Sequence, residues 1–293
     1  MDTLPSPAAP LGLSAWSARR EAHEERVDAW LLPHLERRAR RVAHPVEDFL
    51  FTYYSQRPAA LRRWHPGFGV RLADGTDYVG LKGYDVRDET ATVTRDHVVS
   101  QRPLLAATRA LLAATAGRPP QLACFGLHEW AMVYRQSAPD VRHGAGRLRL
   151  GSAGTDEVVE SHRISCSHFD AFRFFTAEAA PRNALKPGSA DRSDFEQPGC
   201  LHAGMDLYKL AFRLTPMVCS ELVADCFELA REIRVLDMRA SPYDLSDLGH
   251  EPVRVETAAG KAEYVEAQRA FAIRAAPLRA ALLAECDRLL AVR

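Results

Sequence analysis

Residues 201–239 read LHAGMDLYKLAFRLTPMVCSELVADCFELAREIRVLDMR, and this stretch decides the fold class. In its second half the apolar positions are three and four residues apart, as one buried face of an α-helix requires. These positions are Leu222, Val223, Cys226, Phe227, Ala230, Ile233 and Leu236. Ser220 suits the N-cap of this helix, and Pro242 prevents its continuation. We therefore predict two consecutive helices, at residues 201–214 and 221–239.

Helical periodicity also occurs on both sides of this stretch. Further helices are expected at residues 14–41, 45–63, 103–116 and 261–290. Pro33 breaks or kinks the first of them, because proline lacks the N–H that an interior helical position donates. The sequence therefore predicts a pair of surface-packed helices at the N-terminal end.

The β signals are short and lie in the middle of the chain. Residues 70–72 and 78–81 flank Asp74-Gly75, a dipeptide that favours a hairpin turn. Residues 147–150 and 163–168 resemble single strands. Helices, then a little sheet, then helices is the order of an α+β fold. We predict a mainly helical fold with N-terminal helices, a small central antiparallel β region and C-terminal helices.

The composition limits the classes of function. The 293 residues include 38 basic and 38 acidic ones, so no global field attracts nucleic acid, and any polyanion site must be a local patch. Six cysteines at irregular spacings indicate reduced thiols and a cytoplasmic protein. No apolar run reaches the roughly 20 residues that cross a bilayer. We expect a flexible tail at residues 1–13, a single catalytic domain at residues 14–293, no membrane association and no obligate protein partner.

Polar side chains are concentrated between residues 164 and 209, among aromatic and apolar neighbours. They are Cys166, His168, Asp170, Arg173, Arg182, Asn183, Glu196, Cys200, His202, Asp206 and Lys209. Such groups are costly to bury unless they pair, bind a metal or take part in chemistry. This density predicts an enzyme site, within which Arg182 and Asn183 are candidate substrate contacts.

Two spacings within this segment suggest catalytic or metal-binding pairs. His202 and Asp206 are four residues apart on a predicted helix, so they share a face and could share a metal ion or a proton. The same spacing is also that of an ordinary hydrogen-bonded pair. His168 and Asp170 alternate onto one face of a predicted strand, and His202 would complete a metal triad with them. Asp170 is alternatively the N-cap or a first-turn carboxylate of a short helix. Glu129, in an apolar segment, is either a catalytic acid or the structural partner of an arginine.

Arginines next to aromatic residues mark a candidate nucleic-acid surface. Arg62, Arg63 and Trp64 follow Tyr53 and Tyr54, and cations beside flat rings hold phosphates and stack on bases. We expect Arg62 and Arg63 to form one positive surface with the arginines of residues 37–41, although solvated helix faces also carry such clusters. The sequence contains no GxSxG elbow, P-loop, GxGxxG turn or HExxH helix.

Six strings spread over the chain resemble an actinobacterial family whose members are commonly named 3-methyladenine DNA glycosylase. They are HPVEDFLFTYY (from His44), LRRWHPG (from Leu61), CFGLHEWAMVYR (from Cys124), CSHFDAFRFF (from Cys166), EQPGCLHAGMDLYK (from Glu196) and ELAREIRVLDMRASPYDL (from Glu228). The chain lacks the LPGVG-like hairpin and following Asp of helix-hairpin-helix glycosylases, so no catalytic residue is carried over from them.

The resemblance implies a DNA glycosylase that removes an alkylated base by hydrolysing its N-glycosidic bond, with DNA as partner and no cofactor. A flipped base would stack on aromatic rings, for which Tyr53, Tyr54, Trp64 and Trp130 are available. A carboxylate would stabilise the sugar cation, and the candidates are Asp170, Glu129 and Asp206.

Two other interpretations stay open at this point. A metal-dependent enzyme acting on a small molecule would use His168, Asp170 and His202 as ligands, and a helical binding protein would have a purely structural polar core. If either enzyme interpretation holds, His168, Asp170, His202 and one of Glu129 or Asp206 should line a common cavity.

Overall fold

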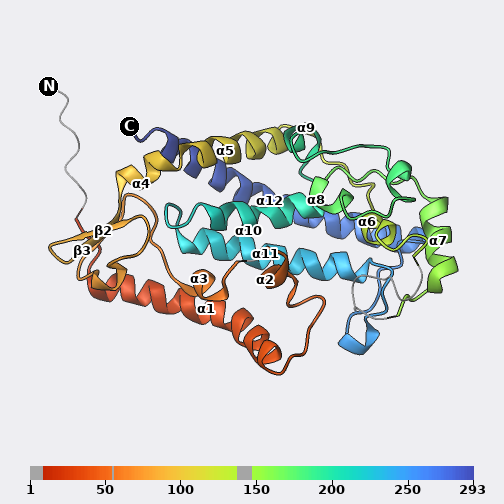
Figure 1. Ribbon diagram of the computed structural model, residues 1–293, viewed down its shortest axis with the longest axis horizontal. Helices are drawn as coiled ribbons and strands as arrows, with labels where there is room; N and C mark the ends of the chain where they lie inside the picture. Colours follow the sequence, from red (N-terminus) through yellow and green to blue (C-terminus); the bar gives the residue numbers. More distant parts are fainter. Residues whose placement is uncertain (1–8, 55, 137–146) are drawn as a thin grey trace.

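The computed structural model describes residues 9–54, 56–136 and 147–293. Long helices form most of it, with a three-stranded antiparallel sheet at one end (Figure 1). The predicted mainly helical α+β fold is therefore confirmed. In Figure 1, α1 follows the lower edge, α5 follows the upper edge, and α10, α11 and α12 run between them.

The two helices predicted from the central stretch are present and pack against each other. They are α10 (Leu201–Arg213) and α11 (Ser220–Arg239). Helix α5 (Arg102–Ala116) and the long α12 (Ala258–Leu290) are also close to their predicted ranges, and α12 contacts α5, α10 and α11. Ser220 is the first helical residue rather than the N-cap, and its hydroxyl accepts a hydrogen bond from the His65 N–H at 2.8 Å.

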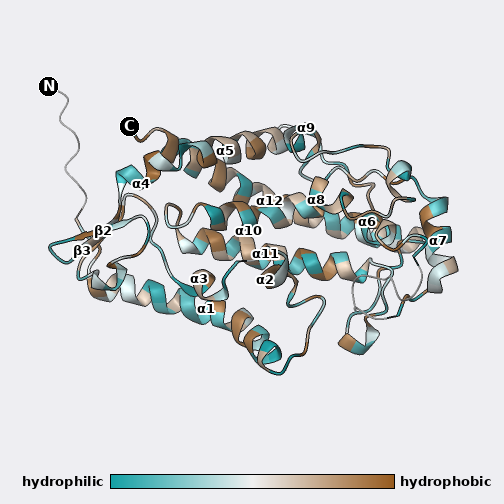
Figure 2. Cartoon of the chain, viewed as in Figure 1, coloured by the Kyte–Doolittle hydropathy of each residue, from teal (hydrophilic) through white to brown (hydrophobic). Residues whose placement is uncertain are grey.

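The predicted N-terminal helix pair is wrong, because α1 (Leu13–Ala39) is one helix that continues through Pro33. Proline removes one backbone hydrogen bond, but packing on both sides of it holds the helix together. The buried face consists of Trp16, His23, Val27, Leu31 and His34. Figure 2 shows that the rest of α1 is largely hydrophilic.

The single helix predicted at residues 45–63 is also wrong. Two short helices, α2 (Phe49–Tyr53) and α3 (Pro58–Arg62), occupy this region. Arg57, which precedes Pro58, has an extended backbone with φ −68° and ψ 123°. A residue before proline is excluded from the helical region by the proline ring, so no helix can run through this point.

The sheet forms with a different pairing from the predicted hairpin. β1 (Arg71–Leu72) pairs with β3 (Thr90–Val93), and β3 pairs with β2 (Tyr84–Arg87), all antiparallel. Residues 76–78 form the 3₁₀ helix η1 (Thr76–Tyr78) instead of a strand. The actual hairpin turn, between β2 and β3, is formed by Asp88 and Glu89 at φ 46° and 57°. This dipeptide lacks the usual glycine, so local sequence gave no signal for it.

Residues 11–13, predicted to belong to a flexible tail, are ordered parts of the fold. The Leu11 N–H donates to the Arg71 carbonyl at 2.8 Å, and the Leu11 carbonyl accepts from the Ala73 N–H at 3.0 Å. Leu11 is thus held beside β1, and α1 begins at Leu13. The prediction of a flexible tail is wrong for residues 11–13, and its part at residues 1–8 lies outside the described residues.

Short helices joined by loops form the end of the molecule opposite the sheet. They include α6 (Leu127–Ala131), α7 (Gly151–Ser161), α8 (Phe169–Phe172), α9 (Arg192–Phe195) and the 3₁₀ helices η3 (Ala180–Arg182) and η4 (Ser246–Leu248). Beside the sheet, α4 (Arg95–Ser100) precedes α5. The strands predicted at residues 147–150 and 163–168 are reduced to isolated bridges, Leu148 with Tyr243 and Ile164 with Asn183.

The main hydrophobic core joins the long helices. Phe227 of α11 is fully buried, and its ring packs against Trp30, Phe51 and Tyr208 at centroid distances of 5.1, 5.3 and 4.8 Å. These three partners belong to α1, α2 and α10, so one ring ties four helices together. Among the described helices, none combines the length and the apolar character that a membrane span needs.

Candidate active site

A small cavity opens between α2, α6, α8 and α10. Its volume is about 120 Å³. Four aromatic rings line it, those of Phe49, Tyr53, Phe174 and Tyr243. Three polar side chains complete the wall, those of Glu129, Asp170 and His202. The structure therefore brings three of the sequence-predicted site residues into one cavity.

Asp170 and Tyr53 also line an open cleft of about 590 Å³ outside the cavity, so these two residues mark the point where the two spaces meet. The cleft carries three cations, Arg173, Lys209 and Arg213. Lys209 Nζ donates to Asp170 Oδ2 at 2.9 Å, and Arg173 Nε lies 3.3 Å from Asp170 Oδ1.

Asp170 is ionised at neutral pH. Burial alone would raise the pKa of this carboxyl, but the hydrogen bond and charge of Lys209 outweigh burial and lower it. The neighbouring Tyr53 keeps its proton, since burial and the Asp170 charge raise its pKa to about 12. Asp170 is a first-turn carboxylate of α8 rather than its N-cap, because His168 occupies the N-cap position.

His168 and Asp206 belong to a second, fully buried group behind the cavity. Asp206 accepts a hydrogen bond from the Tyr54 hydroxyl at 2.9 Å and is paired with Arg192, rather than with His202. Arg192 also bonds Glu196, and His168 Nε2 lies 3.4 Å from Glu196 and 3.5 Å from Asp206. Burial opposes the charge of Asp206, but His168, Lys209 and Arg192 hold its pKa far below the usual range.

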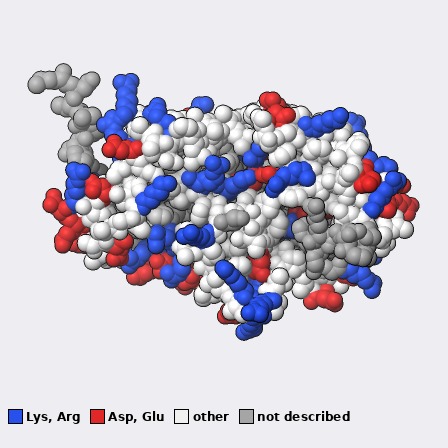
Figure 3. All heavy atoms as spheres, viewed as in Figure 1, with Lys and Arg blue, Asp and Glu red and all other residues white. Residues whose placement is uncertain are grey.

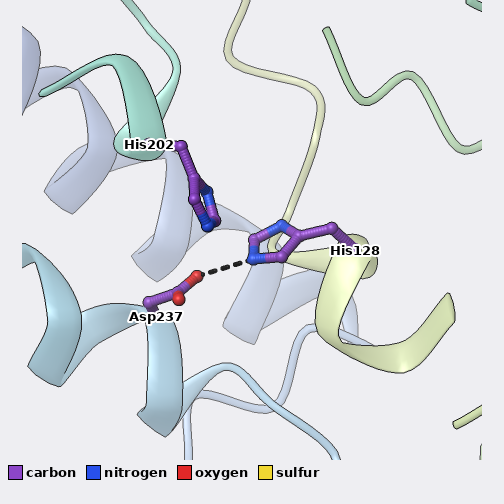
Figure 4. Close-up of side chains that lie close together, drawn as sticks. All are labelled: His128, His202 and Asp237. Atoms are coloured by element: carbon purple, nitrogen blue, oxygen red, sulfur yellow. Dashed lines mark ion pairs between the residues drawn. The ribbon is translucent and has the colours of Figure 1, made fainter. Parts of the chain in front are cut away.

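The predicted metal triad of His168, Asp170 and His202 is wrong. The Asp170 carboxylate forms ion pairs with Lys209 and Arg173, and His168 contacts Arg192 instead. His202 meets His128 and Asp237 instead, and Figure 4 shows these three side chains converging from α10, α6 and α11. Burial and the nearby His128 lower the pKa of His202 to about 3, so its imidazole is neutral.

Glu129 has the arginine partner that its structural interpretation requires. Arg234 Nη1 donates to Glu129 Oε1 at 2.9 Å and to Asp237 Oδ2 at 2.8 Å. The guanidinium also stacks on the cavity residue Phe49, with Cζ 3.7 Å from the ring centroid. Glu129 therefore lines the cavity while it is anchored from behind.

Two of the four aromatic residues expected to stack on a base cannot do so. Trp64 and Trp130 are 1% and 0% exposed, and their indole N–H groups donate to Glu221 and to the Ala240 carbonyl. A stacking ring needs a free face, so these two assignments are wrong. Tyr53 lines the cavity, and Tyr54 lines the outer cleft.

The positive surface predicted around Arg62 and Arg63 is also wrong. Arg62 turns toward α1, where it pairs with Asp28 at 2.8 Å and Glu24 at 3.0 Å. Arg63 caps α3, and its carbonyl accepts a hydrogen bond from Ser220.

The two predicted loop contacts likewise lie outside the cavity wall. Arg182 packs over the Tyr134 ring, with Cζ 5.1 Å from its centroid. The Asn183 side chain bonds both the N–H and the carbonyl of Cys166, at 2.7 and 2.9 Å. Both residues therefore have structural roles.

A different set of arginines lines a second open cleft, of about 560 Å³, where α1 ends. They are Arg38, Arg41 and Arg57, for which the described residues provide no ion-pair partner. Gln56 lines both this cleft and the one beside the cavity, so the two clefts are neighbours. In Figure 3, Lys and Arg side chains gather across the middle of this face and again at its lower edge, where α1 ends. We call these two neighbouring clefts the basic groove.

Sequence reasoning missed several of these residues. Phe174 and Tyr243, which line the cavity, are not among the predicted site residues. The Arg234–Asp237 pair did carry a signal, because a charged pair three residues apart within an apolar stripe implies buried partners. No such signal distinguished Arg57, whose place in the groove depends on how α3 packs.

Comparisons with protein-family models, with curated proteins and with solved structures return no match for this chain.

Proposed function

We propose that this protein hydrolyses the N-glycosidic bond of an alkylated base in DNA, as its sequence resemblance implies. The observation that carries the proposal is an aromatic cavity that opens, at Asp170, into the basic groove. A nucleotide has the same two parts, a flat ring system and an anionic backbone joined at the sugar.

The cavity suits one flat, positively charged group. Its volume of about 120 Å³ is well below the roughly 300 Å³ of a pocket for a drug-sized ligand. Aromatic faces attract cations. Glu129 and Asp170 add carboxylate oxygens to the wall, although Arg234 pairs with Glu129 and Lys209 pairs with Asp170. Alkylation makes a base cationic, so this lining favours an alkylated base over a normal one.

The groove suits the phosphates on either side of that base. Arg173, Lys209 and Arg213 lie immediately outside the cavity, and Gln56 lines both their cleft and the second one. Contacts of arginine and lysine with phosphate give affinity that does not depend on sequence. With a net charge of +0, the protein relies on this local groove rather than on a global field.

Asp170 lies where the glycosidic bond would cross from cavity to groove. An ionised carboxylate at that point stabilises the positive charge that develops on the sugar as the bond to the base breaks. It also orients a water molecule for attack on the sugar carbon. Lys209 and Arg173 hold the carboxylate in position. The departing base needs little help, because a cationic base is already a good leaving group.

Asp170→Asn tests this role. We expect a folded protein that releases methylated bases from dimethyl sulfate-treated duplex DNA about 100-fold more slowly, because the amide cannot supply the carboxylate charge. Base release is measured by chromatography, and folding by thermal melting. Asp247→Asn, at an exposed position of η4, is the control and should keep full activity. Full activity in Asp170→Asn, or no base release by the unaltered protein, would contradict the proposal.

The groove makes a separate prediction about DNA binding. Replacing Arg38, Arg41 and Arg57 together by Ala should weaken binding to every duplex sequence and reduce the slope of log K against log salt by about 2–3 units, roughly 0.9 per lost phosphate contact. Fluorescence anisotropy at several salt concentrations measures the slope. Arg62→Ala removes an arginine that is paired with Asp28 and should leave the slope unchanged. An equal slope in all three proteins would remove the second cleft from the DNA site.

A further inference from the structure

We propose that His128, His202 and Asp237 form a binding site for one divalent transition-metal ion of the zinc or ferrous iron type. The three residues come from α6, α10 and α11, which are distant in sequence, and their side chains converge (Figure 4). Their side chains are almost completely enclosed, at 5%, 8% and 0% exposed. Two imidazoles and one carboxylate are a common ligand set for such ions.

The distances between the ligand atoms fit a shared ion. One nitrogen or oxygen from each residue lies within 4.8 Å of the others. His128 Nε2 and Asp237 Oδ1 are 2.9 Å apart. Two ligands that bind one ion at about 2.1 Å are about 3.0 Å apart in octahedral and about 3.4 Å apart in tetrahedral coordination, so this separation is close to that of neighbouring octahedral ligands.

Hydrogen bonding favours an ion over a simple histidine–aspartate pair. Although they are so close, His128 Nε2 and Asp237 Oδ1 each make no hydrogen bond to any described residue. The oxygen lies off the direction in which an N–H would point. Two ligands of the same ion have this relation, because each points past the other toward the metal. In the structure the two atoms form an ion pair with each other, and a metal ion would take the place of the proton between them.

An arginine holds the Asp237 carboxylate from behind. Arg234 binds the outer oxygen of Asp237 and one oxygen of Glu129, which fixes the carboxylate and leaves Oδ1 directed inward. A second shell that holds a ligand from behind is usual at metal sites.

The other buried group shows what an internally satisfied cluster looks like. His168, Glu196 and Asp206 also lie within 4.8 Å of one another. There, however, the Arg192 guanidinium bonds both carboxylates and so supplies the cation. A metal ion would be repelled from that group. The contrast assigns the metal site to His128, His202 and Asp237 alone.

The site communicates with the cavity through His202, which belongs to both. Three protein ligands leave further coordination positions on the ion, as at catalytic rather than structural metal sites. This inference does not rest on the glycosylase proposal, because its test measures bound metal and not base release.

The test begins with the full-length protein, stripped of metal with a chelator and titrated with cobalt(II). We expect saturation at one equivalent, visible absorption bands from imidazole ligation, and a higher melting temperature in the presence of zinc. Asp237→Ala and His128→Ala should each lower the bound metal, measured by mass spectrometry, at least tenfold. Glu196→Gln, in the cluster filled by Arg192, is the matched control and should keep one equivalent.

Failure takes recognisable forms. If the unaltered protein shows neither cobalt bands nor a zinc-dependent melting shift, His128 and Asp237 are only a buried ion pair and the inference is overturned, even if the variants do not fold. If Glu196→Gln lost as much metal as Asp237→Ala and His128→Ala, the ion would not be assigned to His128, His202 and Asp237, and the inference would be overturned. Absence of base release with one bound metal would contradict the glycosylase proposal and leave the metal site intact.

Discussion

Replacing Arg234 by Met is expected to lower the free energy of unfolding by about 3–5 kcal/mol in metal-free buffer. Arg234, Glu129 and Asp237 are almost fully buried, and the guanidinium is the hydrogen-bonding cation that both carboxylates share. Methionine fills much of the same space, so little packing is lost. The cost arises because two carboxylates remain in a low-dielectric interior without their partner.

Arg274→Met is the control for this variant. Arg274 makes two hydrogen bonds to Glu232, but the pair is about half exposed, so water and salt screen it. Its loss should cost less than about 1 kcal/mol. Urea unfolding of both variants gives the comparison. Adding Glu129→Gln to Arg234→Met should restore part of the loss, since it removes one of the unpaired charges. Equal losses for the two arginine variants would show that burial does not set the strength of the Arg234 contacts.

Phe227→Ala should also be costly, by about 3–5 kcal/mol. Phe227 is 0% exposed and touches the rings of Trp30, Phe51 and Tyr208. Removing it opens a cavity where α1, α2 and α10 meet α11, and rings held by four helices cannot close that space by a small shift. Because α2 also carries Phe49 and Tyr53, the cavity should lose its shape as stability falls.

Chemical unfolding followed by circular dichroism measures this loss. Ile273→Ala removes a large apolar side chain that is 67% exposed, and its effect should stay within about 0.5 kcal/mol. Phe227→Leu leaves a smaller void and should fall between the two. A loss below 1 kcal/mol for Phe227→Ala would mean that the four helices do not depend on this contact.

The sequence predicted the long helices well, because a helix with one buried face repeats its apolar residues every three or four positions. That pattern is local and can be read without knowing the partner, as the ranges of α5, α10 and α11 confirm. It predicted less well wherever a distant contact overrode a local preference. Asp74-Gly75 favours a hairpin on its own, yet β1 pairs with β3 instead.

The candidate site divides in the same way. The sequence by itself singled out Asp170, Glu129 and His202, because they are polar residues in apolar surroundings, and the structure places all three at one cavity. Only the tertiary structure decided the partners: Lys209 for Asp170, Arg234 for Glu129, and His128 with Asp237 for His202. The physical reason is that burial and charge pairing depend on the packing of α6, α8, α10 and α11, and helical periodicity shows which face of a helix is buried but not which helix covers it.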